Sequence, residues 1–347
     1  SGDWIGVVWN DNRGGLSQTY AAFKKLTDTK FGLEIKLSNG KEAIEGAIVA
    51  LDAGRFAVAW EQDGKIYASI VAAGQAQKPV PIGSSLSRQA ALAFGKAGLY
   101  GAWVEQDRRF GRVVVAELLA GPTAIQVKRK LNIENSQPRD EQLYPSLALS
   151  AAGLAVLWED RRGGYTGIFA SHSADLKTFI PPRQLNEMGG GAGRALGLGR
   201  GSGAMRPALA TVADKIVAAV WSDKRDFLSG YDVYGAQSGD GGARFGPNQK
   251  IQDSFGDSMA QWHPAIAANA GKLAVAFDDE RDGTADIWLA WKAGENWSDN
   301  VAVPGAAGPG VQTSPSIALD AQGGLHIVWV ERRAEGAASR VRYTVVK

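Results

Sequence analysis

Cysteine is absent from this 347-residue chain, and histidine occurs only three times. The first absence excludes disulfide bonds and thiolate metal sites, and the three histidines lack the clustered spacing of a histidine metal site. We therefore expect no metal and no cofactor. Lysine and arginine number 38 against 36 acidic residues, so no overall positive field favours nucleic acid as a partner. No apolar run approaches the roughly 18 residues of a membrane span, and we expect no membrane insertion.

Glycine, at 44 residues, and tryptophan, at 11, are abundant instead. Seven segments share one pattern, in which an apolar run ends in an aromatic residue and a burst of charged residues follows, as in VLWEDRRGG. The aromatic positions are Trp9, Trp60, Trp103, Trp158, Trp221, Phe277 and Trp329, separated by 43 to 63 residues. Self-similarity at such a period indicates a repeat array.

Each repeat has the same order of short runs. An opening run such as PSLAL at 145–149 precedes the aromatic run, and GIFASHS at 167–173 and RQLNE at 183–187 follow it. Short runs between Gly, Asp and Ser turns are typical of strands, and the almost wholly apolar aromatic runs indicate strands buried on both faces. A radial stack of sheets provides that burial. We therefore predict an all-β fold, a seven-bladed β-propeller of four-stranded antiparallel blades with the aromatic residues between blades.

We expect a single propeller domain over residues 1–347. Its units are approximately 1–40, 41–84, 85–142, 143–204, 205–260, 261–312 and 313–347. The first unit has no opening run before Trp4, and the seventh stops at Lys347 after its third run. We therefore predict that the first and last blades are incomplete, and that the chain belongs to a longer chain or an assembly.

One segment carries a family resemblance. SGDGGARF, from Ser238 to Phe245, fits the Asp-box pattern Ser-x-Asp-x-Gly-x-x-aromatic, and a poorer copy, SADLKTF, runs from Ser173 to Phe179. On these residues the chain resembles the sialidase-like, Asp-box (BNR-repeat) propellers of bacteria, although the Arg-Ile-Pro motif of sialidases is absent. The resemblance implies turn-forming Asp boxes without a catalytic role. It also implies an exported protein that is secreted, periplasmic or at the cell surface.

The charged burst is interpreted as architecture. An acidic residue and an arginine recur two and four residues after the aromatic one, as Asp11/Arg13, Asp160/Arg162, Asp223/Arg225, Asp279/Arg281 and Glu331/Arg333. An element repeated around a ring favours a structural role, in which the acid accepts turn N–H groups and the guanidinium ties the hairpin.

Function is expected where the repeats differ. The residue before each opening run is Gly46, Gln89, Tyr144, Arg206, His263 or Ser314. Loops on this face of a propeller ring the channel mouth, and a variable set on a uniform scaffold is typical of grafted function. The alternative is that a solvated channel mouth tolerates any residue. The link before the sixth unit adds Asp253, Asp257 and Trp262 as ligand-binding candidates, and the glycine-rich segment 189–203 is either a lid or a plain loop.

Two functions remain open. The first is a binding module that recognises a glycan or a protein partner on the inter-blade-link face, because no complete catalytic constellation stands out. The alternative is a glycan-cleaving enzyme, a sialidase-like hydrolase or a polysaccharide lyase, at the channel mouth. In that case His263 and Tyr144 would supply acid–base chemistry and Arg206 would hold a carboxylate.

Overall fold

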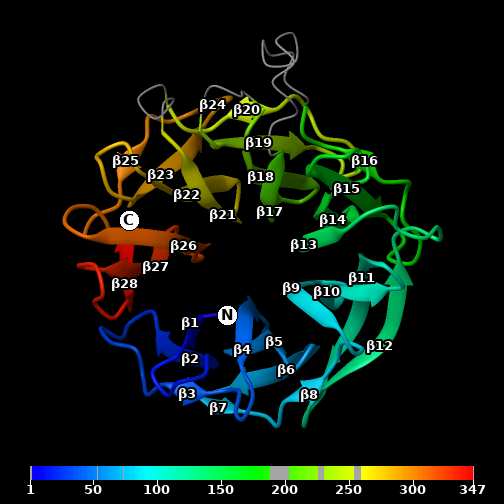
Figure 1. Ribbon diagram of the computed structural model, residues 1–347, viewed down its shortest axis with the longest axis horizontal. Helices are drawn as coiled ribbons and strands as arrows, with labels where there is room; N and C mark the ends of the chain where they lie inside the picture. The colour runs from blue at the N-terminus through cyan, green and yellow to red at the C-terminus, as the bar shows by residue number, and fades with distance from the viewer. Residues whose placement is uncertain are drawn as a thin grey trace. The chain divides into compact units, whose positions relative to one another are not determined.

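The computed structural model describes residues 2–52, 54–72, 74–187, 203–225, 230–253 and 259–346. Every regular element among these residues is a β-strand, and consecutive strands form antiparallel sheets that follow one another along the chain (Figure 1). The chain divides into two compact units, residues 1–149 with 174–181 and residues 150–173 with 182–347. Each unit is described separately below.

The first unit holds three sheets and one further strand. The first sheet contains β1 (Trp4–Asp11), β2 (Gln18–Lys25) and β3 (Ile35–Lys36). The second contains β4 (Ala43–Ala50), β5 (Arg55–Gln62), β6 (Lys65–Ala72), β7 (Gln75–Ala76) and β8 (Val80–Pro81). The third contains β9 (Ser87–Gly95), β10 (Gly98–Asp107), β11 (Phe110–Ala120) and β12 (Ile125–Asn132), and β13 (Gln142–Ser150) opens the fourth.

The second unit continues the series. β14 (Gly153–Asp160), β15 (Gly167–Ser173) and β16 (Arg183–Gln184) belong to the fourth sheet. The fifth contains β17 (Ala204–Ala213), β18 (Ile216–Asp223), β19 (Asp232–Ser238) and β20 (Gln249–Lys250). The sixth contains β21 (Gln261–Asn269), β22 (Lys272–Asp279), β23 (Asp286–Ala293), β24 (Asn296–Trp297) and β25 (Val301–Ala302), and the seventh contains β26 (Val311–Leu319), β27 (Leu325–Arg332) and β28 (Arg340–Val346).

The predicted seven-bladed β-propeller of four-stranded antiparallel blades is confirmed. The prediction of incomplete terminal blades is confirmed as well, because the first and last sheets have three strands each. The division of residues 1–347 as one domain stays a prediction.

Five of the seven repeated aromatic residues lie between successive sheets, as predicted. Trp103 of β10 packs with Ile66 and Ile70 of the preceding sheet, and Trp221 of β18 packs with Leu157 of β14. Trp60, Phe277 and Trp329 make the same contact with the sheet before each of them. All of these aromatic side chains are buried, whereas Trp9 is half-buried. Burial of large aromatic surfaces therefore holds neighbouring blades together.

The charged turn completes this packing, which confirms its structural interpretation. The indole N–H of Trp221 donates to Asp223 Oδ2 at 2.9 Å, and Arg225 pairs with the same oxygen at 2.7 Å. The Arg225 guanidinium then lies 3.7 Å from the ring centroid of Tyr234 on β19. Because Asp223 is buried, these charge-assisted bonds compensate the loss of its hydration.

We predict that Trp221→Phe lowers the free energy of unfolding more than Trp329→Phe does. Both changes remove the same atoms from a buried aromatic position. However, Trp329 Nε1 has no hydrogen-bond partner among the described residues, whereas Trp221 Nε1 bonds Asp223. The loss of unfolding free energy should be about 1–3 kcal/mol larger in Trp221→Phe than in Trp329→Phe, which is the usual cost of leaving a buried polar group unsatisfied. Urea denaturation of both variants measures it, and equal losses would contradict this role of the bond.

Candidate functional site

Each opening strand whose register is described contains a bulge at the variable position. In β21, Trp262 faces Asp278 and Ala265 faces Ala276, so two residues, His263 and Pro264, oppose one. The residues with positive φ at this place are Glu45 (53°), Gln89 (59°), Tyr144 (47°), Arg206 (56°), His263 (48°) and Ser314 (56°). A left-handed conformation costs a non-glycine residue roughly 1–2 kcal/mol, and bulges re-aim side chains next to functional sites.

The bulge register corrects one residue of the variable set. In β4, Ile44 faces Glu61 and Ala47 faces Ala59, so the left-handed residue is Glu45 and not Gly46. Gly46 takes the place that proline holds in later repeats. The second repeat has no proline to mark its bulge, and the sequence alignment there was displaced by one residue.

A second set of residues faces these bulges and was missed from the sequence. The residue directly after each blade aromatic points to the opposite side of the strand, and so toward the next blade. The set is Asn10, Glu61, Val104, Glu159, Ser222, Asp278 and Val330. We call these residues the facing positions. From the sequence, these residues were assigned to the charged turn. Their variation among repeats could have identified them as a separate set.

In the first unit, the facing positions bond the backbone of the next bulge. Asn10 Oδ1 accepts the Gly46 N–H at 3.2 Å, and Glu61 accepts the Gln89 N–H. Burial raises the pKa of Glu61, and the charge of Glu45 adds to the effect.

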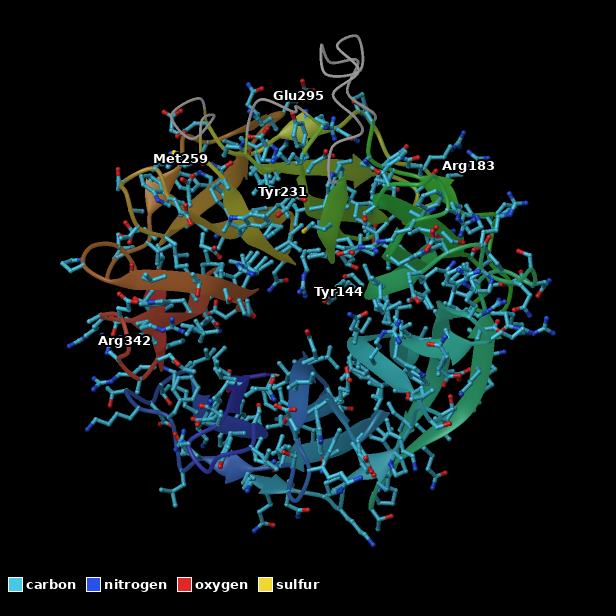
Figure 2. The ribbon with its side chains drawn as sticks, in the orientation of Figure 1. Tyr144, Arg183, Tyr231, Met259, Glu295 and Arg342 are labelled. Carbon is cyan, nitrogen blue, oxygen red and sulfur yellow. The ribbon has the colours of Figure 1, made fainter. Side chains whose placement is uncertain are left out.

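Tyr144 follows a different arrangement, because the facing residue before it is Val104. Its N–H donates instead to the side chain of the preceding bulge residue, Gln89 Oε1, at 3.0 Å. Tyr144 itself is half-buried at its bulge in β13 (Figure 2).

In the second unit, His263 and Asp278 form a hydrogen-bonded pair. His263 Nδ1 lies 2.8 Å from Asp278 Oδ1, and the same oxygen accepts the Ser314 N–H at 3.0 Å. The Asp278 side chain is 3% exposed and that of His263 is 47% exposed. A buried carboxylate on one ring nitrogen fixes the orientation of an imidazole, and Nε2 has no hydrogen-bond partner in the described part of the chain.

Glu159 is another buried carboxyl group at a facing position of this unit. Its Oε1 accepts the N–H of Arg206, an exposed residue, at 2.7 Å. Burial raises the pKa of Glu159, although the Arg206 N–H and guanidinium oppose the effect. A carboxyl group with a raised pKa retains its proton to higher pH, which suits a general acid.

The remaining candidates lie in other surroundings. The Trp262 ring is tilted against Tyr231, with centroids 4.5 Å apart. Asp253 pairs with Arg281 at 2.8 Å and accepts the Asn300 N–H at 3.1 Å, so both oxygens serve the fold. Ser314 is exposed at its bulge. Asp257 and residues 188–202, which include most of the possible lid, lie outside the described residues.

The Asp box forms a closed turn between β19 and β20. Ser238 Oγ donates to Asp240 Oδ1 at 2.8 Å and accepts the Gly242 N–H at 2.8 Å. Asp240 Oδ1 also accepts the Arg244 N–H at 2.9 Å. The polar groups of the box are therefore used within the turn, and it offers no catalytic group.

The described residues contain neither a metal-binding cluster nor a membrane-spanning helix. No cluster of three or more histidine or acidic residues is placed to hold a metal ion. No helix there is long and apolar enough to cross a membrane.

The fold is similar to known propeller structures. The α-L-arabinofuranosidase of Fusarium graminearum is 14% identical with a TM-score of 0.54, over 88% of this chain and 93% of that one. The α-L-arabinanase of Penicillium chrysogenum is 13% identical with a TM-score of 0.54, over 87% and 93%. A puromycin-hydrolysing peptidase of Mycobacterium tuberculosis is 13% identical with a TM-score of 0.55, over 99% of this chain but 49% of that one. No protein-family model and no curated protein matches the sequence.

We predict a pH signature for Glu159. A carboxyl group with a raised folded-state pKa stabilises the protein fully below its ordinary pKa of about 4.3, and this contribution is lost as the pH rises through the raised value. Glu159→Gln keeps an acceptor oxygen but does not titrate. The stability of the wild type relative to this variant should therefore fall as the pH rises above about 4, measured by urea denaturation.

Glu105 provides a matched control of opposite sign. Burial alone would raise the pKa of Glu105, but hydrogen bonds from Lys130 and Trp103 lower it overall. The stability of the wild type relative to Glu105→Gln should therefore rise as the pH increases toward about 4.3, the ordinary pKa of a glutamate, and stay level above it. Parallel pH profiles for the two variants would contradict the assignment for Glu159.

Proposed function

We propose that this protein cleaves glycosidic bonds in a glycan. The observation that carries the proposal is the exposed His263 imidazole held by the buried Asp278 carboxylate. The similar structures named as arabinofuranosidase and arabinanase support glycan cleavage over the pure binding module that the sequence favoured. The Asp-box turn supports a place among the wider Asp-box propellers, and an exported location stays part of the proposal.

The chemistry assigns one role to each group. In hydrolysis, Glu159 would give its proton to the leaving glycosidic oxygen while the bond to the anomeric carbon breaks. His263 Nε2 would take a proton from the attacking water, whose oxygen joins that carbon. Asp278 would keep the imidazole in the tautomer that leaves Nε2 free to accept, and would stabilise the charged ring after proton transfer.

Other residues of the proposed site would contact the sugar without moving protons. Arg206 lies at the bulge beside Glu159 and is exposed. Its guanidinium would bind acidic or hydroxyl groups of the glycan. Trp262 and Ser314 of the same unit stay proposed ligand contacts. Gln89 and Tyr144 belong to the first unit and stay separate predictions from the sequence.

We expect the purified chain to release reducing ends from linear arabinan or from polygalacturonate. His263→Ala should lower kcat about 100-fold or more, since a positioned general base contributes roughly 10²–10⁴. Added imidazole should restore part of the activity of that variant. Asp278→Asn should lower kcat and leave the remaining activity insensitive to imidazole.

The controls separate catalysis from folding. Circular dichroism and thermal unfolding must show that each variant is folded, and Arg244→Ala, which changes an exposed residue of the Asp-box turn, should keep full activity. Binding of these glycans without release of reducing ends would reject the enzyme and support the binding module. Full activity in His263→Ala would reject the proposed site.

A further inference from the structure

The facing position of the fifth blade differs from its neighbours. Ser222 is 1% exposed, and its Oγ has no hydrogen-bond partner among the described residues. Glu159 of the fourth blade and Asp278 of the sixth each use a carboxylate oxygen to accept the N–H of the next bulge residue. Ser222 is therefore a buried polar side chain that lacks the bond made by its equivalents.

Its partner in this arrangement would be His263. Ser222 directly follows Trp221, so it points to the opposite side of β18 and toward the next sheet, and β18 contacts β21. His263 is the left-handed bulge residue of β21. Among the described residues, no side chain accepts a hydrogen bond from the His263 N–H. The short serine thus leaves its own buried hydroxyl group without a partner, and it leaves the His263 N–H without the side-chain acceptor that the Arg206 and Ser314 N–H groups have.

The neighbouring blades indicate the chemistry that fits there. In the blades on either side, the group that bonds the bulge N–H is a carboxylate of the chain itself. In the fifth blade, Met205 faces Ser222 across the β17–β18 pair, which places the bulge residue Arg206 next to Ser222. An arginine and a histidine on the two sides favour an anion, because charge-assisted bonds to a carboxylate are stronger than neutral ones.

We infer that Ser222 Oγ and the His263 N–H form a subsite for a carboxylate of the substrate. The substrate carboxylate takes the position that the Glu159 and Asp278 carboxylates hold in the adjacent blades. The inference rests on the proposed function, since it assigns this carboxylate to a sugar. The substrate class is then an acidic glycan that contains uronic acid, and the subsite places the charged sugar beside His263 Nε2.

Calorimetric titration of the whole chain with D-glucuronate, D-glucose and N-acetyl-D-glucosamine tests the inference. Glucuronate should bind about 10-fold or more tightly than either neutral sugar, because hydrogen bonds to a charged group contribute more than neutral ones. Ser222→Ala should weaken glucuronate binding several-fold and leave the fold stable, since it removes an unsatisfied buried hydroxyl.

The sharper test fills the subsite from within the chain. Ser222→Asn and Ser222→Asp would each supply an oxygen to the His263 N–H, as Asn10 and Asp278 do for the bulges that they face. Both variants should lose the preference for glucuronate over the neutral sugars. If Ser222→Asp does not fold, Ser222→Asn alone decides the test, because its side chain is uncharged. Wild-type affinity in Ser222→Asn would overturn the subsite, as would equal or tighter binding of either neutral sugar by the wild type.

Failure of this inference is distinguishable from failure of the proposed function. Cleavage of a glycan without preferential glucuronate binding rejects the subsite and leaves the enzyme proposal intact. Glucuronate binding that Ser222→Asn abolishes, without cleavage of any glycan, supports the subsite and rejects the enzyme.

Discussion

The structure depends on one repeated contact, the packing of an aromatic side chain at the end of a blade's second strand against the preceding sheet. An indole so placed buries a large apolar surface but also an N–H, which needs an acceptor. The acid two residues later supplies it in several blades, as Asp223 does for Trp221 although Glu331 does not for Trp329, and the arginine four residues later neutralises that acid. Phe277 needs no acceptor, yet Asp279 and Arg281 remain paired in its turn, so the turn also has a role of its own.

That contact also determines where function can be placed. Because the aromatic residue points to one side of its strand, the next residue must point to the other side, toward the following blade. There it meets the left-handed bulge residue of that blade, as Glu159 meets Arg206. The fold holds both positions in place whichever side chain occupies them, since serine and valine also stand at the facing position. They can therefore differ from blade to blade, as functional groups grafted on a scaffold do.

The sequence was sufficient for the fold because the fold rests on local, repeated signals. Apolar runs, turn residues and the Trp-x-Asp-x-Arg spacing each occur within about ten residues and are repeated around the chain. The site was only half predictable. His263 stood out as a variable residue, but its partner Asp278 lies 15 residues on and was hidden within a charged turn. The bulge itself violates a local rule, since a residue before proline normally adopts an extended conformation.

The strained backbone and the facing carboxylates explain each other. A left-handed residue such as Ser314 or Arg206 directs its N–H away from the strand ladder and costs conformational energy. A buried side-chain acceptor that bonds this N–H offsets the conformational cost. The same bond holds the acceptor group in a place away from water. The same bond thus fixes the bulge and, at Glu159, accompanies a burial that raises the pKa of the carboxyl group. At Ser222 the facing side chain makes no such bond, and the proposed subsite assigns its place to a ligand. Variation at the facing position therefore determines which blade stabilises the bulge of its neighbour.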